Sequence, residues 1–425
     1  MPDDSIAPKK RRGIAASILF PAQSVRISIA VLLTFFPCAI LYWLEYPAPE
    51  LIALSAWIWA FPSTVGFLAF ILAPLIPTSV YGYWAFNLFC IIANLSIAWS
   101  AANAREWPVE ALVKMHLFVR GCMLVSLGIC LLQVVTDQNA WMSVFPHMRL
   151  EPGRGAGLRL EPSQMGSLLA LYLIAVVGRL RAIRSGKETG TTSRTRVREA
   201  VVTLLATVVL TRSISVLIVA VCFFPLIFRI RRKQVVWAAV LLIAFFGVAY
   251  SVFCDRINEA AQTSDGDVTE LMTTSLSSWR NTPDILIVND ARDFMLPGSP
   301  SEVRLRLHDS AVLLSPLLGW IQNTFSVFSA AGVTAGLPLT LIAMLAVLLL
   351  GFRRLHGGLS LSFSWGMLYV VAWFIVAKWD PTAWVALGLL PLIQRITGPQ
   401  SSSALATPPV PLNSDAEIPA HLLTL

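Results

Sequence analysis

The chain has 425 residues, of which 56% are hydrophobic and only 13% are charged, and its formal net charge is +8. Soluble domains carry about 25% charged residues, so this composition excludes an ordinary soluble domain and indicates a membrane protein. A basic chain could bind nucleic acid, but here the basic residues fall in short loops between apolar runs, which is the pattern of membrane orientation. We therefore expect no nucleic-acid partner.

Successive apolar runs predict an all-α, polytopic helical membrane bundle of about 11 to 12 transmembrane helices. The expected spans cover residues 25–44, 50–76, 79–101, 112–135, 164–177, 200–211, 213–228, 235–252, 333–352, 360–377 and 382–396. The expected organisation is a cytoplasmic tail at 1–24, a single transmembrane domain at 25–397, and a disordered cytoplasmic tail at 398–425.

Basic loop residues set the expected orientation of these spans. Residues 179–198 carry seven arginines and lysines against one acid, which places this segment in the cytoplasm. Counting spans from there puts 136–163 and 254–331 outside as external loops, and we expect interfacial helices in the second. The count conflicts with the basic N-terminal run at 9–12 unless the long run at 50–76 breaks at Pro62 into two short, tilted or re-entrant halves.

The segment Arg149 to Gly166, RLEPGRGAGLRLEPSQMG, concentrates charge between two apolar runs. Arg154 and Arg159 lie in a glycine-rich and therefore pliable loop, and Pro162 suits the first position of the helix that follows. The free N–H groups of that helix start and the planar arginine fork both favour a phosphate or pyrophosphate. The alternative is that these arginines pair with Glu151 and Glu161, or with lipid headgroups, and only fix the shape of the loop.

The pattern Arg154-x2-Gly157-x3-Glu161-Pro162-Ser163, followed by an apolar span and a basic loop, resembles the O-antigen polymerase and O-antigen ligase superfamily. It is most similar to the exopolysaccharide repeat-unit polymerases. Two other segments resemble further landmarks of this family, namely Thr211-Arg212-Ser213 between two spans and Arg304 followed at a distance by Ser315-Pro316-Leu317-Leu318-Gly319-Trp320. The resemblance covers residues 112–396.

This resemblance implies a multi-pass glycosyltransferase of the bacterial inner membrane. Its donor would be an oligosaccharide repeat unit on an undecaprenyl diphosphate, transferred at the external face to the free sugar end of another lipid-linked chain. We expect no cofactor and no metal, with arginines stabilising the charge that develops on the leaving diphosphate. Other expected partners are membrane lipids and a flippase and chain-length regulator of the same pathway.

The candidate diphosphate-binding residues are the external arginines Arg154, Arg159, Arg212, Arg304 and Arg306, with Arg154 and Arg304 first. A general base must also take a proton from the acceptor hydroxyl, and the candidates are Glu161 and His308. His308 follows Arg304 by four residues, so on a helix the two side chains share one face. His308 could instead be a solvated interface residue, and His147 is a second external histidine.

Two other functions stay open at this stage. A ligase would move finished glycan to a different acceptor, and it would use the same arginines. A non-enzymatic transporter or flippase for the lipid-linked sugar should carry charged residues inside several spans, along a path through the bilayer. The charges of this chain gather instead near the expected external face, which favours transfer chemistry.

Overall fold

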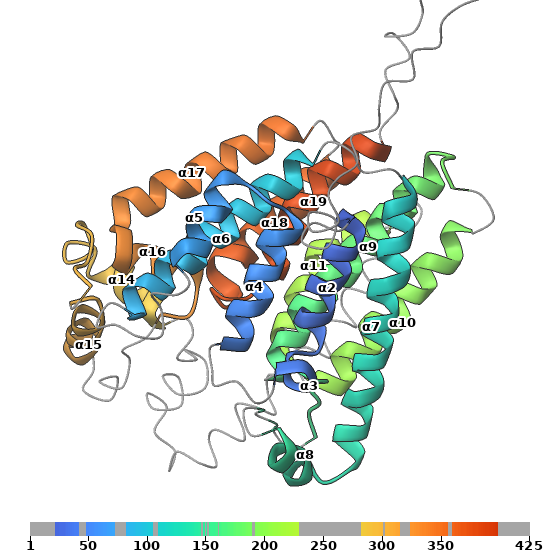
Figure 1. The fold of residues 1–425 in the computed structure, drawn as a ribbon, viewed down its shortest axis with the longest axis horizontal. Coiled ribbons are helices and arrows are strands. Elements are labelled where there is room, and N and C mark those ends of the chain that lie inside the picture. Colours follow the sequence, from blue (N-terminus) through green and yellow to red (C-terminus); the bar gives the residue numbers. More distant parts are fainter. Residues whose placement is uncertain are drawn as a thin grey trace, which may run out of the picture.

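The computed structural model describes residues 22–41, 48–72, 82–104, 109–145, 148, 150, 153–159, 161–188, 192–228, 282–300, 302–314, 324–355 and 359–397. Every regular element within these ranges is helical, which confirms the all-α bundle (Figure 1). The expected span at 235–252, the residues before 22 and after 397, and the motif at 315–320 lie outside the described residues.

Four of the described helices are long and apolar enough to cross a membrane, so the chain is a membrane protein. Shorter apolar helices pack around them. The helices are α2 (Gln23–Phe35), α3 (Pro37–Leu41), α4 (Ala48–Ala60), α5 (Thr64–Leu72), α6 (Gly82–Asn103), α7 (Val109–Val135), α8 (Gln138–Val144), α9 (Met165–Arg184), α10 (Ser193–Thr211), α11 (Ile214–Ile227), α14 (Thr282–Asn289), α15 (Val303–Leu314), α16 (Val327–Ala335), α17 (Leu337–Arg354), α18 (Leu359–Val370) and α19 (Thr382–Thr397).

Helix α9 is the centre of the bundle. Every residue from Met165 to Leu180 is buried, because α7, α10, α11 and α19 all pack against this helix. In Figure 1, α7, α9 and α10 stand side by side on the right of the molecule. A helix that is apolar on all sides needs such neighbours all round. The arginine-rich loop before α9 is therefore attached to the most firmly held helix of the fold.

The expected break at Pro62 is confirmed. Helix α4 ends at Ala60, α5 begins at Thr64, and α5 then packs along α6. The end of α4 lies beside the start of α2, since the carbonyl of Trp59 accepts a 2.7 Å hydrogen bond from Arg26 Nη1. The run at 50–76 therefore contains two short helices in place of one long span.

The bundle has two ends of different chemistry. We call the end formed by residues 153–164, 211–215 and 376–382 the site end. The opposite end is the basic end, formed by 179–187, 353–354 and 395. At the basic end, Lys187 Nζ donates to the carbonyl of Ile396, and Arg354 lies over the ring of Trp99 at 4.5 Å. The positive-inside rule predicts that the basic end faces the cytoplasm.

Candidate functional site

The loop at 153–159 is pinned to the last turns of α7 by a buried glutamine that sequence reasoning did not single out. Gln133 Oε1 accepts the backbone N–H groups of Ala156 and Gly157 at 2.8 and 3.0 Å, and Gln133 Nε2 donates to the Gly157 carbonyl at 2.6 Å. A side-chain amide can make all three bonds because it is donor and acceptor at once. The expectation of a pliable loop is wrong, because this amide and close packing hold it.

Two positions in this loop require glycine, one because its backbone φ is positive and both because a Cβ would collide with α7. Gly157 has φ +66°, and a Cβ built on it would collide with Ser126 Oγ. A Cβ on Gly155 would lie 2.6 Å from the carbonyl oxygen of Cys130. L residues other than glycine are disfavoured at such positive φ, and a well-packed contact cannot take an extra methyl. The glycines therefore let the loop lie directly on α7.

We expect Gly157→Ala to destabilise the protein by about 2 kcal/mol, from the left-handed backbone and the added methyl together. The measurement is the thermal unfolding midpoint of the purified protein in detergent. Gly128→Ala is the matched control, since Gly128 lies on the same helix as Ser126 and a Cβ there meets nothing within 4 Å. That control should gain about 0.5–1 kcal/mol. Equal midpoints for the two variants would show that the loop is looser than described.

The first and second sequence motifs lie together at the site end. Arg154 is only 6% exposed, and its Nε donates to the carbonyl of Thr211 at 2.9 Å. The N–H of Gly155 donates to the carbonyl of Leu210 at 2.8 Å. The last carbonyls of a helix need partners from outside the helix, and the arginine-rich loop supplies them for α10.

Arg212 follows directly in a left-handed conformation with φ 45°, the one non-glycine residue with positive φ in the described part of the chain. Its guanidinium lies against Gly153, since a Cβ on that glycine would be 3.7 Å from Arg212 Nη1. Bulky residues rarely adopt this backbone, and such strain gathers at functional sites. The turn thus aims a cation at the loop that carries Arg154.

The motif Glu161-Pro162-Ser163 opens α9 through a short 3₁₀ turn at Pro162–Gln164, as the sequence predicts for Pro162. The carbonyl of Ser163 accepts a 2.6 Å hydrogen bond from Ser215 Oγ, so the starts of α9 and α11 lie side by side. Glu161 Oε2 accepts from Ser163 Oγ at 3.1 Å. Two helix starts point their positive dipole ends at the same region.

Arg159 is buried on the other side of the loop, in an ion pair with a residue far along the chain. Its Nη2 lies 3.2 Å from Asp380 Oδ2, and its Nη1 donates to the carbonyl of Thr34 at 2.8 Å. Arg159 Nε is buried without a hydrogen-bond partner in the described structure. Asp380 in turn caps α19, since its Oδ1 accepts the N–H and the hydroxyl of Thr382. Among the described contacts of Arg159, its anionic partner is therefore Asp380.

Asp380 belongs to an irregular segment, residues 376–381, between a π-helical turn at Val371–Ile375 and α19. Two residues earlier the same segment holds Lys378, which is 1% exposed. Lys378 Nζ donates to Asn87 Oδ1 and Thr324 Oγ1, both at 2.7 Å, and lies 4.8 Å from the centre of the Tyr83 ring. Ionisable side chains inside a membrane bundle are costly and mark functional sites.

Tyr83 links Lys378 to the third sequence motif. The guanidinium of Arg304 lies 4.8 Å from the centre of the same tyrosine ring. Arg304 is exposed on α15, and His308 follows it by one turn, so the expected helix is confirmed. Arg306 has a different role, since it donates to the carbonyls of Asp293 and Leu296 on the preceding loop.

Asp284 on α14 is an acid that sequence reasoning did not single out. Burial raises the pKa of its carboxyl to about 7, although hydrogen bonds from Ser326 and Ser329 act in the opposite direction. Ser326 Oγ donates to Asp284 Oδ1 at 2.6 Å, two residues from the Thr324 that binds Lys378. A carboxyl that titrates near neutral pH suits proton transfer. Asp284 therefore joins Glu161 and His308 as a candidate base.

Some parts of the expected site lie outside the described residues. They include His147. An Asp-x-Asp pair that the expectation of a metal-free site overlooked, Asp265 and Asp267, also lies outside these residues, and such a carboxylate pair can hold a divalent metal. Searches against protein-family models, curated proteins and solved structures find no match to this chain. A function for the site therefore has to come from its residues and geometry.

Proposed function

We propose that this chain is a multi-pass glycosyltransferase of the bacterial inner membrane that polymerises lipid-linked glycan repeat units. Its donor is an oligosaccharide on undecaprenyl diphosphate, and transfer takes place at the external face. The observation that carries the proposal is a set of five cations, which are Arg154, Arg159, Arg212, Lys378 and Arg304. Arg154, Arg159 and Arg212 lie near the adjoining starts of α9 and α11, whereas Lys378 and Arg304 lie beside the Tyr83 ring at the start of α6.

The charge balance at the site end favours an anionic ligand. The five cations lie with three acids among the described residues named above, which are Asp380, Glu161 and Asp284. Asp380 is already bound to Arg159 and Thr382, and Lys378 lies among neutral amide, hydroxyl and aromatic groups. Parallel helix starts add further positive partial charge. A diphosphate offers acceptor oxygens with the geometry that arginine binds in pairs.

The reaction that fits this arrangement is a displacement at the anomeric carbon of the donor sugar. An acceptor hydroxyl oxygen forms the new glycosidic bond, and the bond from that carbon to the diphosphate oxygen breaks. The electron pair leaves with the lipid diphosphate, whose developing charge the arginines stabilise. The hydroxyl proton passes to a base, for which Glu161 and His308 are the sequence candidates and Asp284 the structural one.

The experiment is to supply the purified full chain in detergent with lipid-linked repeat units and to separate the products by size. We expect a ladder of lengthening glycans, and we expect the ladder to persist with a chelator present, since arginines supply the positive charge. Loss of the ladder with the chelator would show that a metal ion stabilises the leaving diphosphate, held by residues such as Asp265 and Asp267. A single transfer to a non-repeat acceptor would identify a ligase, and absence of any product would refute transfer chemistry.

One observation favours a transporter as the second candidate. The apolar run at 50–72 is interrupted at 61–63, and interrupted helices commonly build the substrate sites of transporters. The same detergent experiment separates the two functions, because a transporter has no second compartment in a micelle and makes no new bond. Movement of labelled lipid-linked sugar across a proteoliposome membrane, without polymer, would favour this second function.

A further inference from the structure

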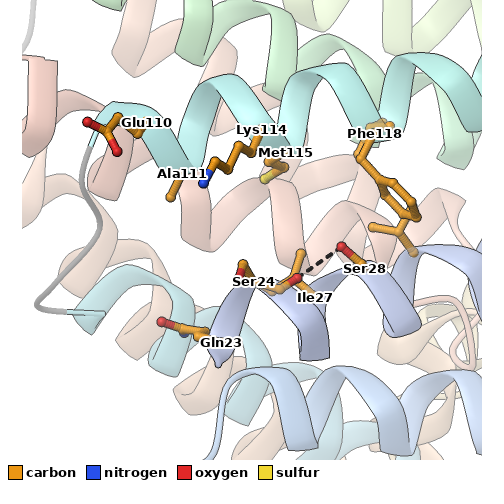
Figure 2. Close-up of a pocket in the computed structure, with 11 residues that line it drawn as sticks. Gln23, Ser24, Ile27, Ser28, Glu110, Ala111, Lys114, Met115 and Phe118 are labelled. Carbon is orange, nitrogen blue, oxygen red and sulfur yellow. Dashed lines mark hydrogen bonds between the residues drawn. The ribbon is translucent and has the colours of Figure 1, made fainter. Parts of the chain in front are cut away.

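A cavity of about 250 Å³ lies between α2 and α7, away from the candidate site. Figure 2 shows Ser24, Ile27 and Ser28 from α2 opposite Lys114 and Phe118 from α7. The first half of α7 runs beside the last turns of α9, because Arg179 Nη1 lies 3.1 Å from His116 Nδ1. This contact places the start of α7, and one side of the cavity, toward the basic end.

The other side of the cavity points toward the site end. Val31 lines it, and Thr34, whose carbonyl binds Arg159, lies one helical turn further along α2. The cavity therefore runs along the bundle, parallel to its helices. Polar residues line the part near the basic end, and the lining changes to aliphatic and aromatic side chains toward the core. A lining that is polar at the membrane surface and apolar toward the bilayer centre has the polarity of a lipid.

We propose that this cavity binds the headgroup and the first acyl-chain carbons of one zwitterionic phospholipid of the phosphatidylethanolamine type, whose remaining chains stay in the leaflet at the basic end. Glu110 and Lys114 are four residues apart on α7, so they lie on one face with Glu110 one turn nearer the membrane surface. In a glycerophospholipid the phosphate is next to the glycerol and the ammonium group is further out. Lys114 therefore meets the phosphate and Glu110 meets the ammonium group.

Three other occupants fit this lining less well. An anionic phospholipid has no cation for Glu110, and a carboxylate beside an anionic headgroup is unfavourable. The polyprenyl chain of the proposed donor would need an apolar surface throughout, whereas Gln23, Ser24 and Lys114 line the cavity at its basic end. A choline headgroup lacks N–H donors for Glu110, so we expect ethanolamine to bind more tightly than choline.

The experiment is native mass spectrometry of the purified full chain in micelles that contain equal amounts of ethanolamine, choline and glycerol phospholipids. We expect the ethanolamine lipid to be retained most. Lys114→Gln and Glu110→Gln should each lower its retention by about three- to fivefold, the range of a surface ion pair. Arg198→Gln, an exposed basic residue of α10 outside the cavity, is the matched control and should change nothing.

Three outcomes would overturn the proposal, and none depends on glycan transfer, because the readout is bound lipid. The first is equal retention of the glycerol and ethanolamine lipids by the unchanged protein. The second is unchanged retention in Ala111→Phe, whose larger side chain fills the mouth of the cavity. The third is displacement of the phospholipid by polyprenyl phosphate, which would assign the cavity to the donor chain.

Discussion

Arg304→Ala is expected to lower glycan polymerisation by about 10²- to 10³-fold, the usual cost of removing one group that stabilises charge in a transition state. Arg304 is exposed on α15 and reaches over the Tyr83 ring toward the segment that holds Lys378. Its removal leaves no buried group without a partner. The unfolding midpoint should therefore stay close to that of the unchanged protein, since surface substitutions usually cost less than about 0.5 kcal/mol.

Arg306→Ala is the matched control for Arg304→Ala. It removes the same charge from the same helix, two residues away. Arg306 is held by the carbonyls of Asp293 and Leu296 and by Glu302, so its loss should weaken the attachment of α15 to the preceding loop. We expect Arg306→Ala to lower the unfolding midpoint and to keep activity per folded molecule within about threefold.

The measurements are initial rates of polymer formation and thermal unfolding of the same purified samples. Equal losses of activity in the two variants would mean that only the overall charge of α15 matters. Normal polymer from Arg304→Ala would show that α15 is not part of the site. Diphosphate binding would then rest on the cations at the starts of α9 and α11. Tyr83→Phe keeps the ring beside Arg304 and removes the hydroxyl that binds Thr324. It should therefore lower the unfolding midpoint and keep the activity per folded molecule if the ring face alone positions Arg304.

Local signals in the sequence were sufficient for much of the fold. Composition and apolar runs identified the membrane bundle, Pro62 located the helix break, and Pro162 located the start of α9. The four-residue spacing of Arg304 and His308 predicted their common helix. Each of these inferences depends on residues within a few turns of one another, where hydrophobicity and backbone preferences act directly.

Long-range partners could not be predicted in this way. Asp380 lies 221 residues from Arg159, and no periodicity connects them, so the sequence suggested the nearby glutamates instead. Gln133 was one polar residue in a long apolar run, and its bonds to the loop depend on how α7 packs. Lys378 resembled an ordinary residue between two spans until the fold placed it beside Asn87 and Tyr83.

The second large effect concerns the buried pair of Arg159 and Asp380. Arg159→Met leaves the Asp380 carboxylate buried without a cation, and Asp380→Asn leaves the Arg159 cation without its anion. Removing one partner of a buried ion pair lowers the free energy of unfolding by about 3–5 kcal/mol, because the remaining buried charge has no counter-charge. Asparagine is itself a good helix cap, so Asp380→Asn keeps the contacts to Thr382 and removes mainly the charge.

The double variant separates a structural role of Arg159 from a binding role. With both charges removed, neither Arg159→Met nor Asp380→Asn leaves a buried charge without a partner. We therefore expect the double variant to lose about 2 kcal/mol less free energy of unfolding than the sum of the losses of the two single variants. The protein should then be folded but should make no polymer, because Arg159 Nε no longer offers a buried donor to the diphosphate. The measurements are the thermal unfolding midpoint and the polymer yield of the unchanged protein, the two single variants and the double variant. A folded double variant with normal polymer would confine Arg159 to holding the loop against α19, and it would leave diphosphate binding to Arg154, Arg212 and Arg304.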